Sequence, residues 1–172
     1  MLKLEKYSIG VGDRFAHQAK AQLKAFQKLA EEGVEAVPVW NKSNREHTFI
    51  GSEPESVIVA AKESVESLGW DKGWHVDADH IGLETVDRFL PHSDFFTIDV
   101  ADFIGKPAEP ADVQAFIEKH SELVGSIDIE GIDGALEISR EDVERVANQF
   151  LLAAKGAGKV YRYIKEQKGG ND

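Results

Sequence analysis

The richest set of chemically active side chains lies in the segment His75-Val76-Asp77-Ala78-Asp79-His80. The period of two in a strand would place His75, Asp77 and Asp79 on one face, with His80 released into the following loop. Carboxylate oxygen and imidazole nitrogen are ligands that suit Mn²⁺, Zn²⁺, Co²⁺, Ni²⁺ or Fe²⁺. We therefore expect a divalent metal ion or a catalytic centre here. The alternative is that Asp79 caps the next helix and Asp77 pairs with an arginine.

Another acid, Asp99, lies in the apolar run from Phe95 to Val100. A carboxylate in such a run is costly to bury unless it is paired or bound to something. Asp99 is therefore a candidate catalytic residue, although a structural role explains it equally well. Asp102, just beyond, is more simply a solvated loop residue.

A glycine turn followed by an acid and a base is formed by Gly10-Val11-Gly12-Asp13-Arg14. The third glycine of a dinucleotide-binding fingerprint is missing, because position 15 is Phe15. The Arg14 guanidinium has the geometry to grip a carboxylate or a phosphate with two hydrogen bonds. A surface network between Asp13 and Arg14 is the alternative.

A polar segment from Asn41 to His47 follows the apolar run that ends at Trp40. It is too long for a short connector, and Lys42, Arg45 and His47 make it locally basic in a protein with a net charge of -11. We expect Asn41, Lys42, Arg45 and His47 to bind an anionic group of a substrate.

These clusters each follow one of four short apolar runs that predict strands. The four runs are Tyr7–Val11, Ala36–Trp40, Trp74–Val76 and Phe95–Val100. Helical periodicity lies between them, over Phe15–Glu32, Pro54–Leu68 and Leu83–Leu90. Alternating strands and helices predict an α/β fold with parallel strands, whose ligands bind at the carboxyl ends of the strands.

The pattern changes after Pro107. A helix is predicted over Pro110–Leu123, an extended segment over Ser126–Ile132, and a long helix over Ser139–Gln167 that begins with a capping motif. We expect residues 1–107 to form four βα units of a TIM-barrel-like fold. Residues 108–172 would be a mainly helical insertion or lid.

Composition excludes several classes of protein. The 31 acidic residues outnumber the 20 Lys and Arg, which disfavours nucleic acid as a partner. The absence of cysteine excludes disulfides, thiolate metal sites and thiol catalysis. No apolar run approaches the roughly 20 residues of a membrane span, and the first six residues lack a signal-peptide core, so we expect a cytoplasmic protein. A closed barrel takes about 250 residues, so this chain alone is too short to form one.

Three segments resemble, in order and in their placement at strand ends, the tagaturonate epimerase family. They are Ser8–Arg14, Val76–His80 and Phe96–Asp102, and the resemblance covers about Tyr7 to Pro107. It implies a metal-dependent (β/α)₈ barrel, of which this chain would be the N-terminal half. The reaction it implies is epimerisation of D-tagaturonate to D-fructuronate, two keto-hexuronates of carbohydrate breakdown.

The resemblance also implies roles for particular residues. Asp77, Asp79 and His80 would lie at the metal or catalytic centre, flanked by Arg14 and Asp99. The route, by proton removal or by retro-aldol cleavage, stays open, and we expect little or no epimerase activity from this chain alone.

Two alternatives to an epimerase also stay open. One is a metal-dependent hydrolase or phosphatase that uses the same acids on the same scaffold. The other is a non-catalytic half-barrel that assembles with a partner or a second copy through its open face.

Overall fold

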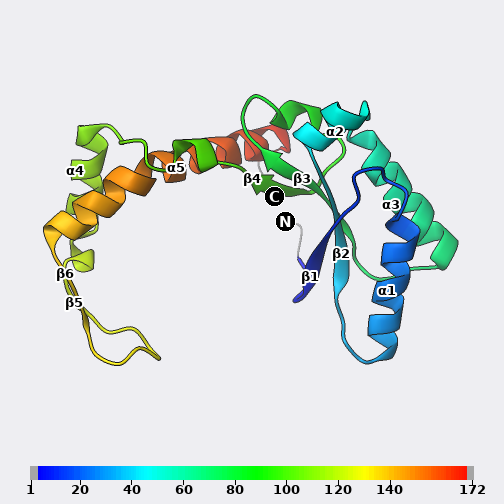
Figure 1. The fold of residues 1–172 in the computed structure, drawn as a ribbon, viewed down its shortest axis with the longest axis horizontal. Coiled ribbons are helices and arrows are strands. Elements are labelled where there is room, and N and C mark those ends of the chain that lie inside the picture. Colours follow the sequence, from blue (N-terminus) through cyan, green and yellow to red (C-terminus); the bar gives the residue numbers. More distant parts are fainter. Residues whose placement is uncertain (1–3, 170–172) are drawn as a thin grey trace. The chain divides into compact units, whose positions relative to one another are not determined.

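A parallel four-stranded sheet forms the centre of the N-terminal part of the chain in the computed structural model (Figure 1). Its strands are adjacent in chain order: β1 (Ser8–Gly12), β2 (Val37–Ser43), β3 (His75–Ile81) and β4 (Phe95–Ile98). The predicted α/β fold with parallel strands is therefore confirmed.

The structure describes residues 4–169, which form two compact units. The first unit contains residues 4–99 and 160–169, and the second contains residues 100–159. The first three residues of the N-terminal segment and the last three of the predicted C-terminal region lie outside the described residues.

Two helices, α1 (Ala19–Glu31) and α3 (Glu55–Leu68), lie along one face of the sheet (Figure 1). Leu23 of α1 and Ala61 of α3 are fully buried and pack in one cluster that includes Trp40 of β2. Because side chains alternate along a strand, the residues next to Trp40 in β2 point to the opposite face. We call this opposite side the inner face; it carries Asn41, Ser43, Asp77 and Asp79.

The short helix α2 (Asn44–Ile50) follows β2 directly. Ser43 and Glu46 form a capping box, in which each side chain bonds to the other residue's backbone N–H. The polar segment from Asn41 to His47 therefore divides between a strand and a helix. Its first residues extend β2, and the Ser-x-x-Glu spacing begins a helix.

Strand β3 continues to Ile81, so His80 lies within it and not in the following loop. The predicted helix over Leu83–Leu90 is also wrong, since only the 3₁₀ turn η1 (Val86–Arg88) forms there. The Gly82 backbone N–H donates to the Thr85 hydroxyl at 3.1 Å, which closes a tight turn at the start of this segment.

The long helix α5 (Arg140–Gln167) begins at the predicted cap, where the Ser139 hydroxyl donates to Asp142 at 2.7 Å. Its last turns belong to the first unit, because Val160 and Ile164 pack in a cluster with Ala78. Ala78 points to the same face as Trp40, so the end of α5 covers the sheet as the helix of a fourth βα unit does.

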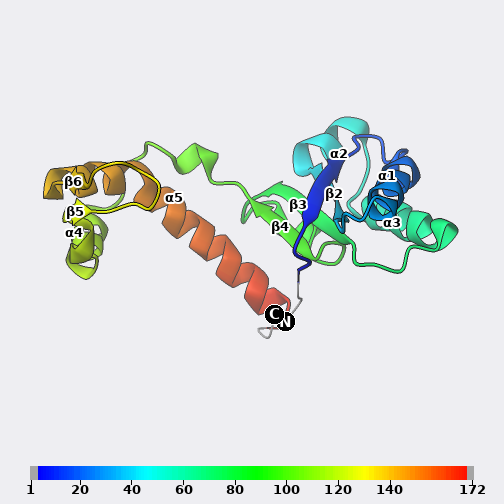
Figure 2. The same cartoon turned by 90° about the horizontal axis from the view of Figure 1, so that it is seen from below.

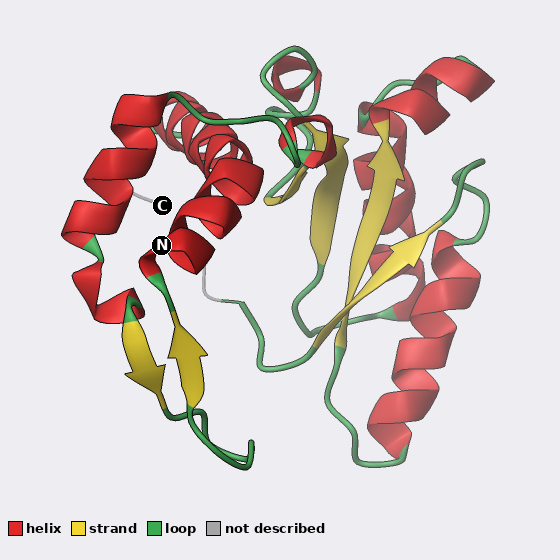
Figure 3. Ribbon diagram, turned by 60° about the vertical axis from the view of Figure 1, so that its left-hand side comes forward, coloured by secondary structure: helices red, strands yellow, loops and turns green. Residues whose placement is uncertain are grey.

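The second unit contains α4 (Pro110–Lys119), the first part of α5 and an antiparallel hairpin of β5 (Gly125–Ile127) and β6 (Leu136–Ile138) (Figures 2 and 3). Two 3₁₀ turns, η2 (Ala101–Phe103) and η3 (Ser121–Leu123), flank α4. The sequence predicted the extended segment at β5 but not its pairing with β6.

None of the helices among the described residues is long and apolar enough to cross a membrane.

Candidate active site

The carboxyl ends of β2 and β3 bring several predicted site residues together on the inner face. Asn41 is in register with Asp77, and Ser43 is in register with Asp79. Asn41 also lies close over β1: a Cβ at Gly12 would be only 2.9 Å from the Asn41 Oδ1 atom. Glycine at this position lets the amide approach the backbone of β1, a role that the sequence does not reveal.

Asp79 and His80 form a hydrogen-bonded pair, with 2.7 Å between Asp79 Oδ1 and His80 Nδ1. The imidazole is 62% exposed, and this bond leaves its Nε2 atom for another partner. The His80 backbone has φ of 54°, a left-handed conformation uncommon for a residue with a side chain, at an irregularity between Ala78 and Ile81. Such backbone conformations cluster at functional sites. The alternative that Asp79 caps the next helix is not what the structure shows.

Asp77 is buried and bonds across to β4. Its carboxylate accepts hydrogen bonds from the Thr97 backbone N–H at 2.9 Å and from the Thr97 hydroxyl at 2.7 Å. Burial raises the pKa of Asp77, the Thr97 bonds oppose that change, and the negative charge of Asp79 adds to it. Both carboxylate oxygens are engaged by Thr97, and among residues 4–169 no arginine is paired with Asp77.

The three residues proposed as metal ligands do not make a complete site by themselves. Among residues 4–169, no three His, Asp or Glu side chains are arranged to hold a metal ion. Asp77 is committed to Thr97, so Asp79 and His80 offer only two donors. Among the described residues, the site therefore offers at most two ligands of a metal centre, Asp79 and His80, and does not complete one.

Asp99 lies beyond the end of β4 and is exposed. Its backbone N–H donates to the Ile81 carbonyl at 2.9 Å, which places it beside the end of β3. The expectation of a carboxylate inside an apolar strand is therefore wrong, because β4 stops at Ile98. Asp102 is exposed in the turn η2.

Arg14 reaches α2 from the loop that follows β1. Its Nε atom is 3.3 Å from Glu46 Oε1, and its guanidinium lies 5.8 Å from the centre of the Phe49 ring. Asp13 instead accepts a hydrogen bond from the Phe15 backbone N–H at 3.2 Å. The suggested Asp13–Arg14 network is thus replaced by an Arg14–Glu46 ion pair.

The basic segment divides between surface and interior. Arg45 is exposed, whereas Lys42 and His47 are each only 1% exposed. Lys42 Nζ and His47 Nε2 have no hydrogen-bond partner among the described residues, although His47 Nδ1 lies 2.8 Å from the Ser52 hydroxyl. Burial lowers the pKa of Lys42. Burial, with the positive charges of Lys42 and Arg88, lowers the pKa of His47 to about 4.

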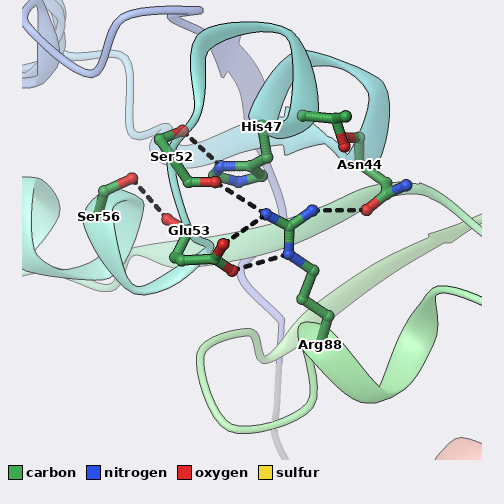
Figure 4. A network of polar contacts seen from close by, with 7 residues as sticks. Asn44, His47, Ser52, Glu53, Ser56 and Arg88 are labelled. Atoms are coloured by element: carbon green, nitrogen blue, oxygen red, sulfur yellow. Dashed lines mark hydrogen bonds and ion pairs between the residues drawn. The ribbon is translucent and has the colours of Figure 1, made fainter.

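Figure 4 shows a polar network around Arg88 that the sequence did not predict. Arg88 donates to both carboxylate oxygens of Glu53 at 2.8 and 3.0 Å, to the Asn44 side chain at 2.8 Å and to the Ser52 carbonyl at 2.8 Å. It thereby connects η1 to the two ends of the α2 segment and to the start of α3. No local pattern marked Arg88, whereas the capping-box spacing could have marked Glu46.

A family model described as tagaturonate epimerase matches residues 1–170. The chain belongs to this family. The resemblance found at the strand ends is thereby confirmed, and the match also includes the second unit. Comparison with curated proteins gave no match.

Crystal structures of the fructuronate-tagaturonate epimerase UxaE from Cohnella laeviribosi have a similar fold. The two-glycerol complex aligns with a TM-score of 0.72 and 19% identity over 96% of this chain and 35% of that chain. The native structure aligns with a TM-score of 0.66 and 21% identity over 96% of this chain and 35% of that chain. The one-glycerol complex aligns with a TM-score of 0.66 and 21% identity over 94% of this chain and 34% of that chain. This tagaturonate epimerase family chain thus spans about a third of those solved chains, less than the half that we expected.

Proposed function

We propose that the protein takes part in the epimerisation of D-tagaturonate to D-fructuronate in the cytoplasm, as the N-terminal part of a (β/α)₈ barrel. Family membership supports the substrate class. The observation that carries the proposal is the Asp79–His80 pair at the carboxyl end of β3, the edge at which parallel α/β folds bind their ligands.

The pair is suited to proton transfer. When Asp79 accepts the Nδ1 proton of His80, it fixes the tautomer in which Nε2 has a lone pair for a proton. His80 would remove the proton of the hydroxyl on the carbon that is inverted, and the bond from that carbon to the carbon beside the keto group would break to an aldehyde and an enolate. The enolate would re-form the bond on the other face of the aldehyde while His80 returns the proton, which gives the epimer. Asp99, beside the end of β3, is our candidate for the second proton-transfer group. Asp77 would position β4 through Thr97.

The carboxylate of the keto-hexuronate would bind to Arg14 at the exposed edge, with Asn41 and Arg45 nearby on β2 and α2. Lys42 and His47 could contact the substrate only if α2 moved, because both are buried.

A divalent metal ion at this pair is the alternative to proton transfer by His80, because an Nε2 atom bound to a metal ion cannot also take up a proton. Asp79 and His80 would supply two ligands, and the remaining ligands would come from outside residues 4–169. Calorimetric titration with Mn²⁺ or Zn²⁺ tests this alternative. Metal affinity that is unchanged in both Asp79→Ala and His80→Ala would contradict it.

The reaction itself is tested by following D-tagaturonate in D₂O by NMR, with residues 1–172 present in the complete barrel that the proposal requires. His80→Gln should lower the rate at least about a hundredfold, because general acid–base groups typically contribute that much or more. His120→Gln is the matched control, since His120 bonds to Glu122 in the same manner at 3.0 Å in the second unit. Full activity in His80→Gln would contradict the proposal, and turnover of phosphate esters in place of keto-hexuronates would favour a phosphatase.

A further inference from the structure

A chain of side-chain contacts runs from the end of β2 to the Arg14 guanidinium. We propose that Glu46 and Phe49, neither of which has an assigned role, set the specificity of the site for a carboxylate-bearing sugar by holding Arg14 ready to receive that carboxylate. This inference rests on the proposed function and names the residues that select its substrate class.

Hydrogen bonds from Ser43 fix the Glu46 carboxylate that contacts Arg14. Its Oε2 atom accepts hydrogen bonds from the Ser43 backbone N–H and from the Ser43 hydroxyl, both at 3.1 Å. The other oxygen, Oε1, therefore remains for the Arg14 Nε–H at 3.3 Å. The hydrogen bonds from Ser43 and Arg14 keep the pKa of Glu46 below its ordinary value against the effect of burial, so the group stays a carboxylate at neutral pH.

Two further interactions position Arg14, one in its loop and one at its side chain. Its loop is closed by Asp13, whose carbonyl accepts from the Ala16 backbone N–H at 3.1 Å. The guanidinium lies 5.8 Å from the centre of the Phe49 ring, within the range of a cation–π contact. Phe49 itself is 76% exposed, so this aromatic ring is kept at the surface, where it contributes little to the core.

The contacts of Arg14 leave its two terminal nitrogens for a ligand. Within the described part of the chain, the Nε bond to Glu46 is the one hydrogen bond recorded for this side chain, which is 52% exposed. The two terminal nitrogens are the donors that remain, and a pair of parallel N–H groups matches the two oxygens of a carboxylate. A guanidinium already fixed in this way loses less side-chain freedom when the ligand binds.

The position of the network connects it to the chemistry. Ser43, which holds Glu46, is in register with Asp79 on the neighbouring strand. Neighbouring strands are about 4.8 Å apart, so the residue that holds the arginine network lies one strand from the Asp79–His80 pair. The arginine network and the Asp79–His80 pair therefore lie at the ends of neighbouring strands, on the same edge of the sheet.

Glu46→Gln is the decisive variant. The glutamine amide oxygen can still accept from Ser43, but its –NH₂ group then faces the Arg14 Nε–H, and two donors cannot pair. We expect the Kd for a keto-hexuronate, measured by calorimetry, to rise about tenfold. The Kd for the ketohexose that lacks the carboxylate should stay unchanged. In turnover by the complete barrel that contains residues 1–172, KM should rise while kcat changes little, and Phe49→Leu should act in the same direction.

A matched control exists in the second unit. Asp142 accepts from the Ser139 hydroxyl at 2.7 Å and from Arg145 at 3.0 Å, so Asp142→Asn makes the same chemical change in the same type of network. Its keto-hexuronate Kd should equal that of the wild type.

The inference is overturned if Glu46→Gln and Phe49→Leu both bind the keto-hexuronate like the wild type, or lose both sugars equally. A wild-type protein that binds no keto-hexuronate overturns it as well. A wild-type protein that binds the keto-hexuronate with Arg14-dependent affinity but does not convert it contradicts the proposed reaction alone. If Glu46→Gln does not fold, Phe49→Leu, altered at an exposed position, decides the outcome.

Discussion

Two buried histidines of the first unit differ in the charge of their neighbours. His75 lies between two carboxylates, with Nε2 2.9 Å from Glu5 and Nδ1 2.9 Å from Asp94. His47 instead lies near the positive charges of Lys42 and Arg88. Because both ring nitrogens of His75 face acceptors, its protonated form is favoured, whereas the neutral form of His47 is favoured.

His75 should make the protein less stable in alkaline solution. Burial lowers the pKa of His75, but the hydrogen bonds to Glu5 and Asp94 outweigh burial and raise it above the ordinary value of 6.5. The folded state therefore holds the proton more tightly, and this stabilisation is full below 6.5 and is lost as the pH rises through the folded pKa. Urea unfolding from about pH 6 to about pH 9 should show the decline. His75→Gln should show a weaker decline, and an equal decline in both proteins would contradict the assignment.

His47 should make the protein less stable in acidic solution. Its pKa is lowered from 6.5 to about 4, so the unfolded chain binds a proton between those values and the folded chain does not. Stability should therefore fall as the pH drops from about 6.5 to about 4. An NMR titration of the imidazole signals measures the pKa directly. A midpoint near 6.5 would show that the ring is not held in the neutral state.

At the scale of elements, the last turns of α5 cover the sheet of the first unit. Ile164 is buried in the cluster with Ala78 and Ile81, so Ile164→Ala should reduce the free energy of unfolding by about 2–4 kcal/mol. Tyr161 on the same turn is exposed, and Tyr161→Ala should change it by less than about 0.5 kcal/mol. Equal effects of the two substitutions in urea unfolding would contradict this placement.

The elements that the sequence predicted well are those whose pattern is local. The apolar periods of α1, α3 and the four strands lie within each segment, and their bounds were found to within a few residues, apart from the carboxyl ends of β2 and β3 and the first turn of α1. The predicted apolar runs stop at Trp40 and Val76 because polar residues follow, and only His80 was expected in a loop, although β2 continues to Ser43 and β3 to Ile81. A polar strand end and a loop have the same composition, so periodicity could not separate them.

The candidate site shows the same limit. Asp79 and His80 were found because they are adjacent in the sequence at a strand end. Glu46 was missed as a partner of Arg14, and Arg88 was missed altogether, because the contacts of both join residues 32 or more positions apart. Such pairs depend on the packing of α2 against the neighbouring loops, which no local pattern describes.

At the scale of the whole molecule, the sheet has two unpaired edges among the described residues. β1 pairs with β2 and β4 pairs with β3, and β1 carries Ile9, which is 48% exposed. Unpaired edges of parallel sheets are sites of association. We predict that a chain of residues 1–172 self-associates with rising concentration, as measured by sedimentation velocity.

Ile9→Lys should weaken that association, because a charge on an edge strand disfavours pairing. Val59→Lys, at an exposed position of helix α3, is the control and should leave it unchanged. A monomer at every concentration would rule out association through the edges, and would indicate that the sheet of the first unit needs no partner at its edges.

The second unit, residues 100–159, also has a consequence for how the protein is made. In the sequence, it separates β4 from the end of α5, which covers that strand. Phe96 of β4 can therefore pack in the cluster of Ile164 only after the second unit has been synthesised. At about 5–20 residues per second, a ribosome needs roughly 3–12 s to synthesise the intervening segment. A loop of ten residues closes in well under a microsecond, so this delay is set by translation and not by the search of the chain. The fourth strand of each newly made molecule therefore stays uncovered for seconds on the ribosome, and it is the last part of the sheet to become protected.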